Sequence, residues 1–233
     1  DDPAIISGPA ILRRRFVDMF ISMLDYEYFT SLQHYSSALK SRNFLLKSGK
    51  IDMNLIDSYN FILAEKGTLI ASKKTHYITI LSNTMKRILS EVRPELSDFE
   101  IKIRTPKDSF EKSLFLAKLE SSFQRDIQKG FTSFGPHLDD FEFISDSKPL
   151  RIYGSQGQCR MASLCLKLAE YEVVLDISKS PNDTVVLVDD ATNDLDRNAK
   201  NAFLSTISGA GQVFYAFTET HEDEFFRDSQ IFH

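Results

Sequence analysis

The first part of the chain carries apolar residues at intervals of three and four, the spacing of amphipathic helices. Asp25 and Gly49 separate three apolar stripes, and Pro94 ends the third. Gly67 costs that third helix about 1 kcal/mol relative to alanine and marks a place for a kink or break. Three successive long helices predict an antiparallel helical arm over residues 1–96. The stripes comprise Leu12, Phe16, Met19, Phe20, Met23 and Leu24; Tyr28, Leu32, Tyr35, Leu39 and Leu46; and Tyr59, Ile62, Leu63, Tyr77, Ile80, Leu81, Ile88 and Leu89.

A mixed strand and helix pattern follows the arm. Phe99, Ile101 and Ile103 alternate with charged residues, which is typical of a half-buried strand. A helical stripe that ends at Gly130 comes next. We expect residues 97–130 to link the arm to a second lobe.

Residues 131–233 alternate short strands with helices. Thr184–Val188 is an apolar, β-branched run without alternation, as expected of a strand buried on both faces in a parallel sheet. A helix over residues 199–207 and a buried strand over residues 212–217 follow. The predicted fold class is α/β for this lobe and α+β overall, with a parallel sheet plus a helical arm.

The segment Tyr153–Gln158, YGSQGQ, has the pattern of a helix N-terminus. Ser155 followed three residues later by Gln158 matches a capping box. Gly154 and Gly157 let another molecule approach the backbone where the free amides and the positive end of the helix dipole are exposed. The segment therefore predicts a phosphate-binding site.

Two carboxylates, Asp189 and Asp190, end the predicted buried strand. Ligands of α/β sheets bind at the carboxyl ends of strands, and adjacent side chains of an extended chain point to opposite sides. One carboxylate is thus suited to hold a hydrated magnesium ion and the other to orient or deprotonate a water. We expect this strand end to lie beside the capped helix tip; a simple surface turn is the alternative interpretation.

Composition limits the classes of function. With 42% hydrophobic and 26% charged residues the chain is an ordinary globular protein. It shows no membrane-spanning run and no signal-peptide pattern, so a cytoplasmic location is the default expectation. A formal net charge of −5 does not indicate nucleic-acid binding, and any DNA contact would depend on a local basic patch or on assembly. The 2 cysteines and 5 histidines lack metal-ligand spacing.

Several motifs resemble those of ABC-type ATPases: GSQGQ stands where their LSGGQ signature stands, VVLVDD resembles a Walker B strand, and NDLD resembles the D-loop. GPHLDDFEF (135–143), YGSQGQCRMASLCLKLAE (153–170) and LVDDATNDLD (187–196) are similar, in that order and spacing, to the RecF family of bacterial recombination and repair proteins. SGPAILRRRFVD (7–18) and YSSALKSRNFLL (35–46) also look like RecF segments. The resemblance covers nearly the whole chain.

The resemblance implies a role for each motif. The signature of one subunit would cap the γ-phosphate of ATP bound to the P-loop of another, Asp189 would associate with Mg²⁺, and Asp190 would be the catalytic residue. It also implies an ATP-dependent homodimer, binding to DNA gaps or junctions, cooperation with RecO and RecR, and a part in the SOS response. The ATP-binding residues that it implies are Ser155, Gln156, Gly157, Gln158 and the D-loop aspartate Asp196.

The chain departs from the family pattern at two positions. Leu138 stands where the family has Arg. Ala216 stands where RecF-like proteins usually place a Thr that contacts the γ-phosphate, so Thr218 would have to supply that contact. No GxxxxGK[ST] motif occurs in the sequence, and in RecF this P-loop lies upstream of the part resembled here. We therefore expect no ATP hydrolysis by this polypeptide alone.

Arg13, Arg14 and Arg15 are candidate DNA-binding residues. At about 100° per residue they cannot all serve one surface of a helix. A solvated helix face, or ion pairs with carboxylates of the α/β lobe, are the alternatives.

Two other functions stay open. A non-catalytic docking or regulatory module derived from this fold is favoured by Leu138, Ala216 and the missing P-loop. An SMC-type chromosome-maintenance ATPase is the third candidate, but Leu55–Leu89 is too short for a long coiled coil.

Overall fold

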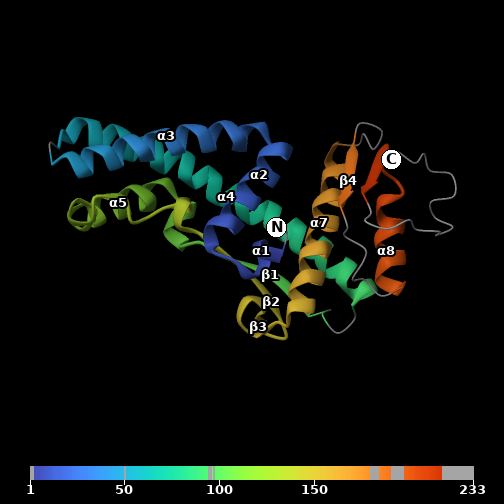
Figure 1. The fold of residues 1–233 in the computed structure, drawn as a ribbon. Helices are drawn as coiled ribbons and strands as arrows, with labels where there is room; N and C mark the ends of the chain where they lie inside the picture. Colours follow the sequence, from blue (N-terminus) through green and yellow to red (C-terminus); the bar gives the residue numbers. More distant parts are fainter. Residues whose placement is uncertain are drawn as a thin grey trace.

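Helices form the first part of the structure, as the apolar spacing predicts (Figure 1). The computed structural model describes residues 3–49, 51–93, 96, 98–178, 184–189 and 197–216. The helices are α1 (Pro3–Ser7), α2 (Ala10–Leu24), α3 (Tyr26–Ser48) and α4 (Met53–Val92). The side chain of Asp25 accepts a hydrogen bond from the Tyr28 amide and caps α3, and Gly49 ends that helix in the left-handed conformation. α3 and α4 then run side by side, and α1 to α4 together are called the arm.

α4 is one continuous helix of 40 residues, so the helix does not break at Gly67. A Cβ atom at Gly67 would lie 2.7 Å from the ring of Phe115 and 3.1 Å from the ring of Tyr35. Glycine therefore allows α3 and α5 (Lys112–Lys129) to pack closely against α4. That packing outweighs the cost of about 1 kcal/mol that glycine imposes on a helix.

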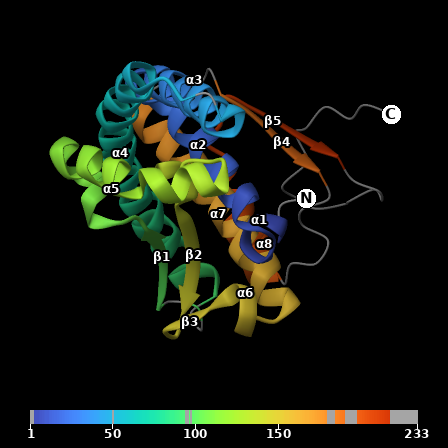
Figure 2. The ribbon, with the colours of Figure 1, turned by 90° about the vertical axis from the view of Figure 1, so that its left-hand side faces the viewer.

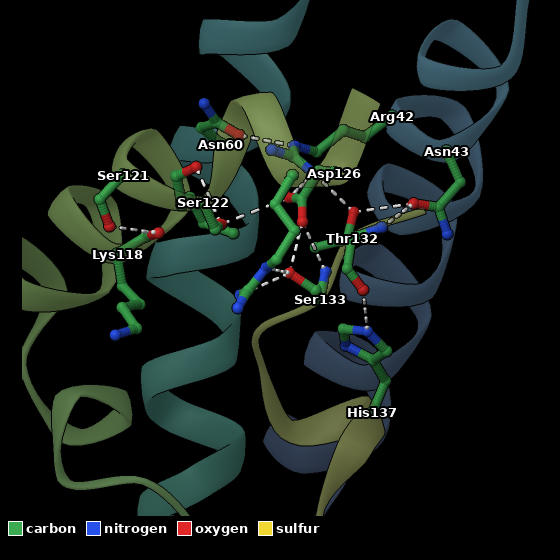
Figure 3. Close-up of polar contacts among 12 residues, drawn as sticks. Arg42, Asn43, Asn60, Lys118, Ser121, Ser122, Asp126, Thr132, Ser133 and His137 are labelled. Atoms are coloured by element: carbon green, nitrogen blue, oxygen red, sulfur yellow. Dashed lines mark hydrogen bonds and ion pairs between the residues drawn. The ribbon is translucent and has the colours of Figure 1, made fainter. Parts of the chain in front are cut away.

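A buried polar network fastens α5 and the loop after it to α3 and α4 (Figure 3). Arg42 of α3 forms a 2.9 Å salt bridge with Asp126 of α5, and both side chains are 0% exposed. The Arg42 guanidinium also donates to Asn60 Oδ1 at 2.8 Å and to Thr132 Oγ1 at 2.7 Å. Asn43 accepts a hydrogen bond of 2.7 Å from the Thr132 amide. Partners from three helices and a loop thus compensate charges that would be costly to bury alone.

A three-stranded antiparallel sheet adjoins the arm. Its strands are β1 (Phe99–Arg104), β2 (Asp140–Ser145) and β3 (Lys148–Pro149), and the short 3₁₀ helices η2 (Lys107–Phe110) and η3 (Pro136–Leu138) lie between β1 and β2 in sequence. Phe99 pairs with Ser145. Within β1, Phe99 and Ile101 are buried while Glu100 and Lys102 are exposed, which confirms the alternation predicted for this strand. Positive φ angles at Asp146 and Ser147 form the turn between β2 and β3.

A two-stranded parallel sheet ends the described chain. It contains β4 (Val185–Asp189) and β5 (Gln212–Ala216), with α8 (Arg197–Ile207) between them in sequence. This confirms the parallel pairing predicted for the α/β lobe. Val188 joins the core with residues of α8, but Val185, Leu187 and Phe214 are 55%, 77% and 47% exposed. The prediction that this strand is buried on both faces is therefore wrong for the described structure, because its second face has no packing partner there.

One hydrophobic core extends from the arm into the second lobe. α1 packs against α6 (Leu150–Tyr153) and α7 (Gln156–Ser178), α2 packs against β2, and α4 packs against β1 and α7. The boundary placed at residue 96 thus marks a change of secondary structure within continuous packing. Among the helices that the structure describes, none has the length and apolarity needed to cross a bilayer.

The Arg42–Asp126 pair should be a major source of stability for the arm. Arg42→Ala leaves the Asp126 carboxylate buried without its counter-charge, and we expect the free energy of unfolding to fall by about 3–5 kcal/mol. The control is Arg104→Ala, which removes the exposed partner of Glu142 and should cost less than about 1 kcal/mol. Urea denaturation followed by circular dichroism measures both variants. Equal losses would contradict the role assigned to the buried pair.

Candidate functional site

The junction of α6 and α7 presents a helix end to solvent. The Ser155 amide donates to Gln158 Oε1 at 2.8 Å, and the Gln158 amide donates to Ser155 Oγ at 3.2 Å. This reciprocal pair is the capping box expected from the sequence. Ser155, Gln156 and Gly157 are exposed, and Gln158 is half-buried. The first turn of α7 therefore offers backbone amides and the positive end of its dipole to a ligand, and the Ser155 hydroxyl keeps its own hydrogen for donation.

The two glycines of this junction differ in their surroundings. A Cβ atom on Gly154 would lie 2.7 Å from the Leu150 carbonyl oxygen and 3.3 Å from Cys159 Sγ, so the fold itself requires glycine there. A Cβ atom on Gly157 would meet only Ser155 Oγ, at 4.0 Å, which is ordinary contact. Within the described residues, packing therefore does not demand glycine at Gly157, and its missing side chain keeps the helix end accessible from outside.

Asp189 lies at the carboxyl end of β4, is exposed, and pairs in register with Ala216 of β5. Magnesium is held in proteins through one or two carboxylates together with phosphate oxygens and waters, so a single exposed carboxylate here fits such an ion. In the part of the chain that the structure describes, no three His, Cys, Asp or Glu side chains gather at one metal-sized position. Asp190 and Asp196, predicted as catalytic and ATP-binding residues, and Thr218 lie outside the described residues.

The helix tip and the strand end do not lie side by side. Figure 2 shows α6 and the start of α7 at the bottom of the molecule and the β4–β5 sheet at the top, and Figure 1 agrees. The expectation that Ser155 and Asp189 are neighbours is therefore wrong, because α7 (Gln156–Ser178) carries the chain from one end of the lobe to the other. One chain cannot place both groups on the same phosphate.

The three arginines of α2 have different surroundings. Arg13 is 2% exposed and donates to both carboxylate oxygens of Asp140, at 3.0 and 3.2 Å. Arg14 donates to the Asp139 carbonyl oxygen at 3.0 Å. Arg15 is exposed, with no hydrogen bond or ion pair to another described residue. Arg13 thus forms an ion pair with a carboxylate of the lobe, which was the alternative to DNA binding. Its burial keeps it from contacting a phosphate backbone. The charge of Arg15, in contrast, is accessible to solvent.

A buried charged cluster beneath α2 was missed from the sequence. Lys74 is 2% exposed and lies 3.1 Å from Asp18 and 3.9 Å from Asp139. Burial raises the pKa of Asp139 to about 6, against the opposing effect of the Lys74 charge. The available signal was the position of Lys74 on the buried stripe of α4, between Ala71 and Tyr77. A lysine at a core position requires a buried counter-charge.

The exposed capped helix end, the parallel strand that ends in an aspartate and the attached helices fit the fold of the ABC-type class. Solved structures agree. The chain is similar to the recombination mediator protein RecF with ATPrS in the RecFOR pathway, with a TM-score of 0.82 and 31% identity over 94% of this chain and 61% of that one. It is also similar to RecF with ATP, with a TM-score of 0.81, 29% identity, and coverage of 95% and 61%.

Sequence comparison gives the same result. The chain is 35% identical over 237 residues to the DNA replication and repair protein RecF of Ruminiclostridium cellulolyticum. The alignment covers 97% of this chain and 62% of the relative. It is 32% identical over 228 residues to RecF of Bacillus cytotoxicus, covering 94% and 60%. The chain is thus similar to RecF proteins over nearly its whole length, and it spans 60–62% of the length of these two relatives. No family model matches it.

Substituting the two glycines separately should distinguish folding from ligand access. Gly154→Ala introduces a clash with the Leu150 carbonyl, and we expect it to lower the free energy of unfolding by about 1–3 kcal/mol. Gly157→Ala meets open space in a helix and should leave stability unchanged or raise it by up to about 1 kcal/mol. Thermal denaturation tests both. A comparable loss in Gly157→Ala would mean that this glycine serves the fold.

Proposed function

We propose that this chain supplies the signature tip and the Walker B strand of an ATP-dependent DNA repair ATPase in which two copies enclose ATP. The observation that carries the proposal is the exposed end of α7, held by the Ser155–Gln158 capping box and left open over Gly157. RecF relatives with ATP and ATPrS support a nucleotide as the ligand of this tip. Gln156 would add its backbone amide to the same site.

The binding free energies involved favour a nucleotide that is held mainly by a second subunit. A helix N-terminus contributes about 0.3–1 kcal/mol to anion binding. Even millimolar affinity requires about 4 kcal/mol. The sequence contains no GxxxxGK[ST] motif, so the P-loop must come from outside these residues. The capping tip then contributes selectivity for a triphosphate already bound by its partner.

The separation of tip and strand end fits a two-fold dimer. In such an assembly the same surface of each copy faces the other, so Ser155 of one copy would reach the nucleotide that lies beside Asp189 of its partner. When Mg²⁺ is bound there, it neutralises the charge of the phosphates. Asp189 would hold that ion, Asp190 would orient the attacking water, and Asp196 would contact the nucleotide across the dimer, as in the ATPases that these motifs resemble.

The wider assignments rest on the family. We expect the ATP-closed dimer to bind DNA gaps or junctions and to act in the cytoplasm with RecO and RecR. The relatives named for the RecFOR pathway and for DNA replication and repair support this. With a formal net charge of −5, DNA contact must use local cations, for which Arg14 and Arg15 remain candidates and the buried Arg13 does not.

A non-catalytic docking or regulatory module is the second candidate. Its specific support is Ala216, which lies opposite Asp189 and has no hydroxyl to offer a γ-phosphate, and Leu138, which is exposed where the family carries a charge. An SMC-type function has less support. α4 is about 60 Å long at 1.5 Å per residue, yet it packs against other helices and β1 along its length instead of projecting alone.

The signature role predicts that Ser155→Arg abolishes ATP-dependent dimerisation in an intact RecF-type polypeptide that contains this chain. The long side chain would occupy the space over Gly157 that the partner's nucleotide needs. Loss of the Ser155 cap should cost only about 0.5–2 kcal/mol, and circular dichroism verifies that the variant folds. Ser121→Arg, at an exposed serine of α5, is the matched control and should dimerise normally. Size-exclusion chromatography with light scattering, with and without ATP, gives the answer. Unchanged dimerisation of Ser155→Arg would contradict the proposal.

Residues 1–233 alone should show no steady ATP turnover, because no group in them can hold the β- and γ-phosphates as a P-loop does. A coupled phosphate-release assay measures this, with the P-loop-bearing polypeptide as the positive control. If residues 1–233 show ATP turnover and the Asp190→Asn variant shows it equally, the activity comes from a contaminant. Turnover that this substitution removes would refute the assignment of a divided site.

A further inference from the structure

A groove of about 660 Å³ lies between α2 and α3, with η3 and α4 at its floor. We infer that it is a docking site for an acidic amphipathic segment of a partner protein. The residues that line the groove belong to α2, α3, α4 and η3, and none of them belongs to α6, α7 or β4. The groove is therefore separate from the nucleotide site, and the inference does not rest on the proposed ATPase function.

The walls of the groove are apolar and open. Ile11 and Met19 of α2 are 62% and 56% exposed, and Phe29 of α3 is 38% exposed. Leu32 and Ile70 lie deeper in the same hollow. Large apolar side chains gathered around a groove mark a surface that becomes covered, and a flexible methionine adapts to different apolar partners. The surface suits bulky apolar anchors spaced along one face of a helix.

The polar groups of the floor are already paired. The Tyr35 hydroxyl lies 2.7 Å from His137 Nδ1, and His137 Nε2 lies 3.1 Å from the Thr132 carbonyl oxygen. A carbonyl only accepts, so Nε2 carries the hydrogen and Nδ1 accepts from Tyr35. Burial lowers the pKa of His137 to about 4, which leaves the ring neutral at physiological pH. An apolar anchor can therefore cover this floor without leaving a polar group unpaired.

Charge selects the kind of segment. The Lys74 charge at the floor is neutralised by Asp18 at 3.1 Å. Arg14 donates to the Asp139 carbonyl oxygen and also interacts electrostatically with the Asp139 carboxylate, whereas Arg15 is exposed at the groove with no hydrogen bond or ion pair to another described residue. The exposed positive charge of Arg15 beside an apolar trough, on a chain of net charge −5, complements Asp or Glu flanking the anchors.

A protein segment fits these observations better than nucleic acid does. DNA binding draws its affinity from several phosphate contacts along a basic stripe. Here three cations line the hollow, of which Lys74 is buried and paired with Asp18, and much of its wall consists of aliphatic and aromatic side chains. Such walls are matched by leucine, phenylalanine or methionine anchors.

A displayed library of amphipathic peptides tests the inference. The library is selected on residues 1–233 and counter-selected on Met19→Asp, and enriched peptides are then labelled and titrated by fluorescence anisotropy. We expect enriched sequences to combine bulky apolar residues with Asp or Glu. Their affinity should fall about tenfold or more in Arg15→Glu, a variant that takes no part in the selection. Both positions are exposed, and circular dichroism verifies that the variants fold.

Matched controls lie on α5, outside the groove. Lys118→Glu and Leu114→Asp repeat the two substitutions at exposed positions and should leave peptide affinity unchanged. The inference is overturned if no peptide survives the counter-selection, if the enriched peptides are basic or uncharged, or if the α5 variants weaken binding equally. It is also overturned if a DNA duplex binds and loses affinity in Arg15→Glu but not in Met19→Asp, which would assign the groove to nucleic acid.

Discussion

The unbroken course of α4 is the constraint on which the rest of the structure depends. Its first half packs against α3 and α5 around Gly67, and its second half packs against β1 and α7. Arg87 of α4 also forms an ion pair with Glu172 of α7. Because one hydrogen-bonded helix serves both regions, the arm and the helix that carries the signature tip are held in a fixed relation. A movement of either must shift α4 or break the close contact at Gly67.

Features whose partners lie within one helical turn could be predicted from the sequence. Ser155 and Gln158 cap each other across three residues, and Gly49 ends a helix through its own backbone conformation. The amphipathic stripes gave the long helices for the same reason, because their spacing reflects the local helical period. The signature tip was therefore predictable in both position and geometry.

Features set by distant residues could not be predicted. The burial and ion pairing of Arg13 depend on Asp140, which lies 127 positions away in the sequence. Gly67 looked like a helix breaker because the rings of Tyr35 and Phe115, for which it leaves room, come from other elements. The apolar run at Leu187 indicated burial on two faces, but composition cannot show which face finds a partner.

The placement of the two phosphate-directed groups carries the most functional weight. The helix end and the Asp189 carboxylate, which we propose to act on phosphate and Mg²⁺, would each be weak alone, and α7 holds them at opposite ends of the lobe. Under that proposal, a rigid helix cannot bend to bring them together, so their cooperation would require a second copy in reversed orientation. In that arrangement neither copy holds a complete site. Nucleotide binding and dimerisation then become one equilibrium, in which each stabilises the other by the same free energy.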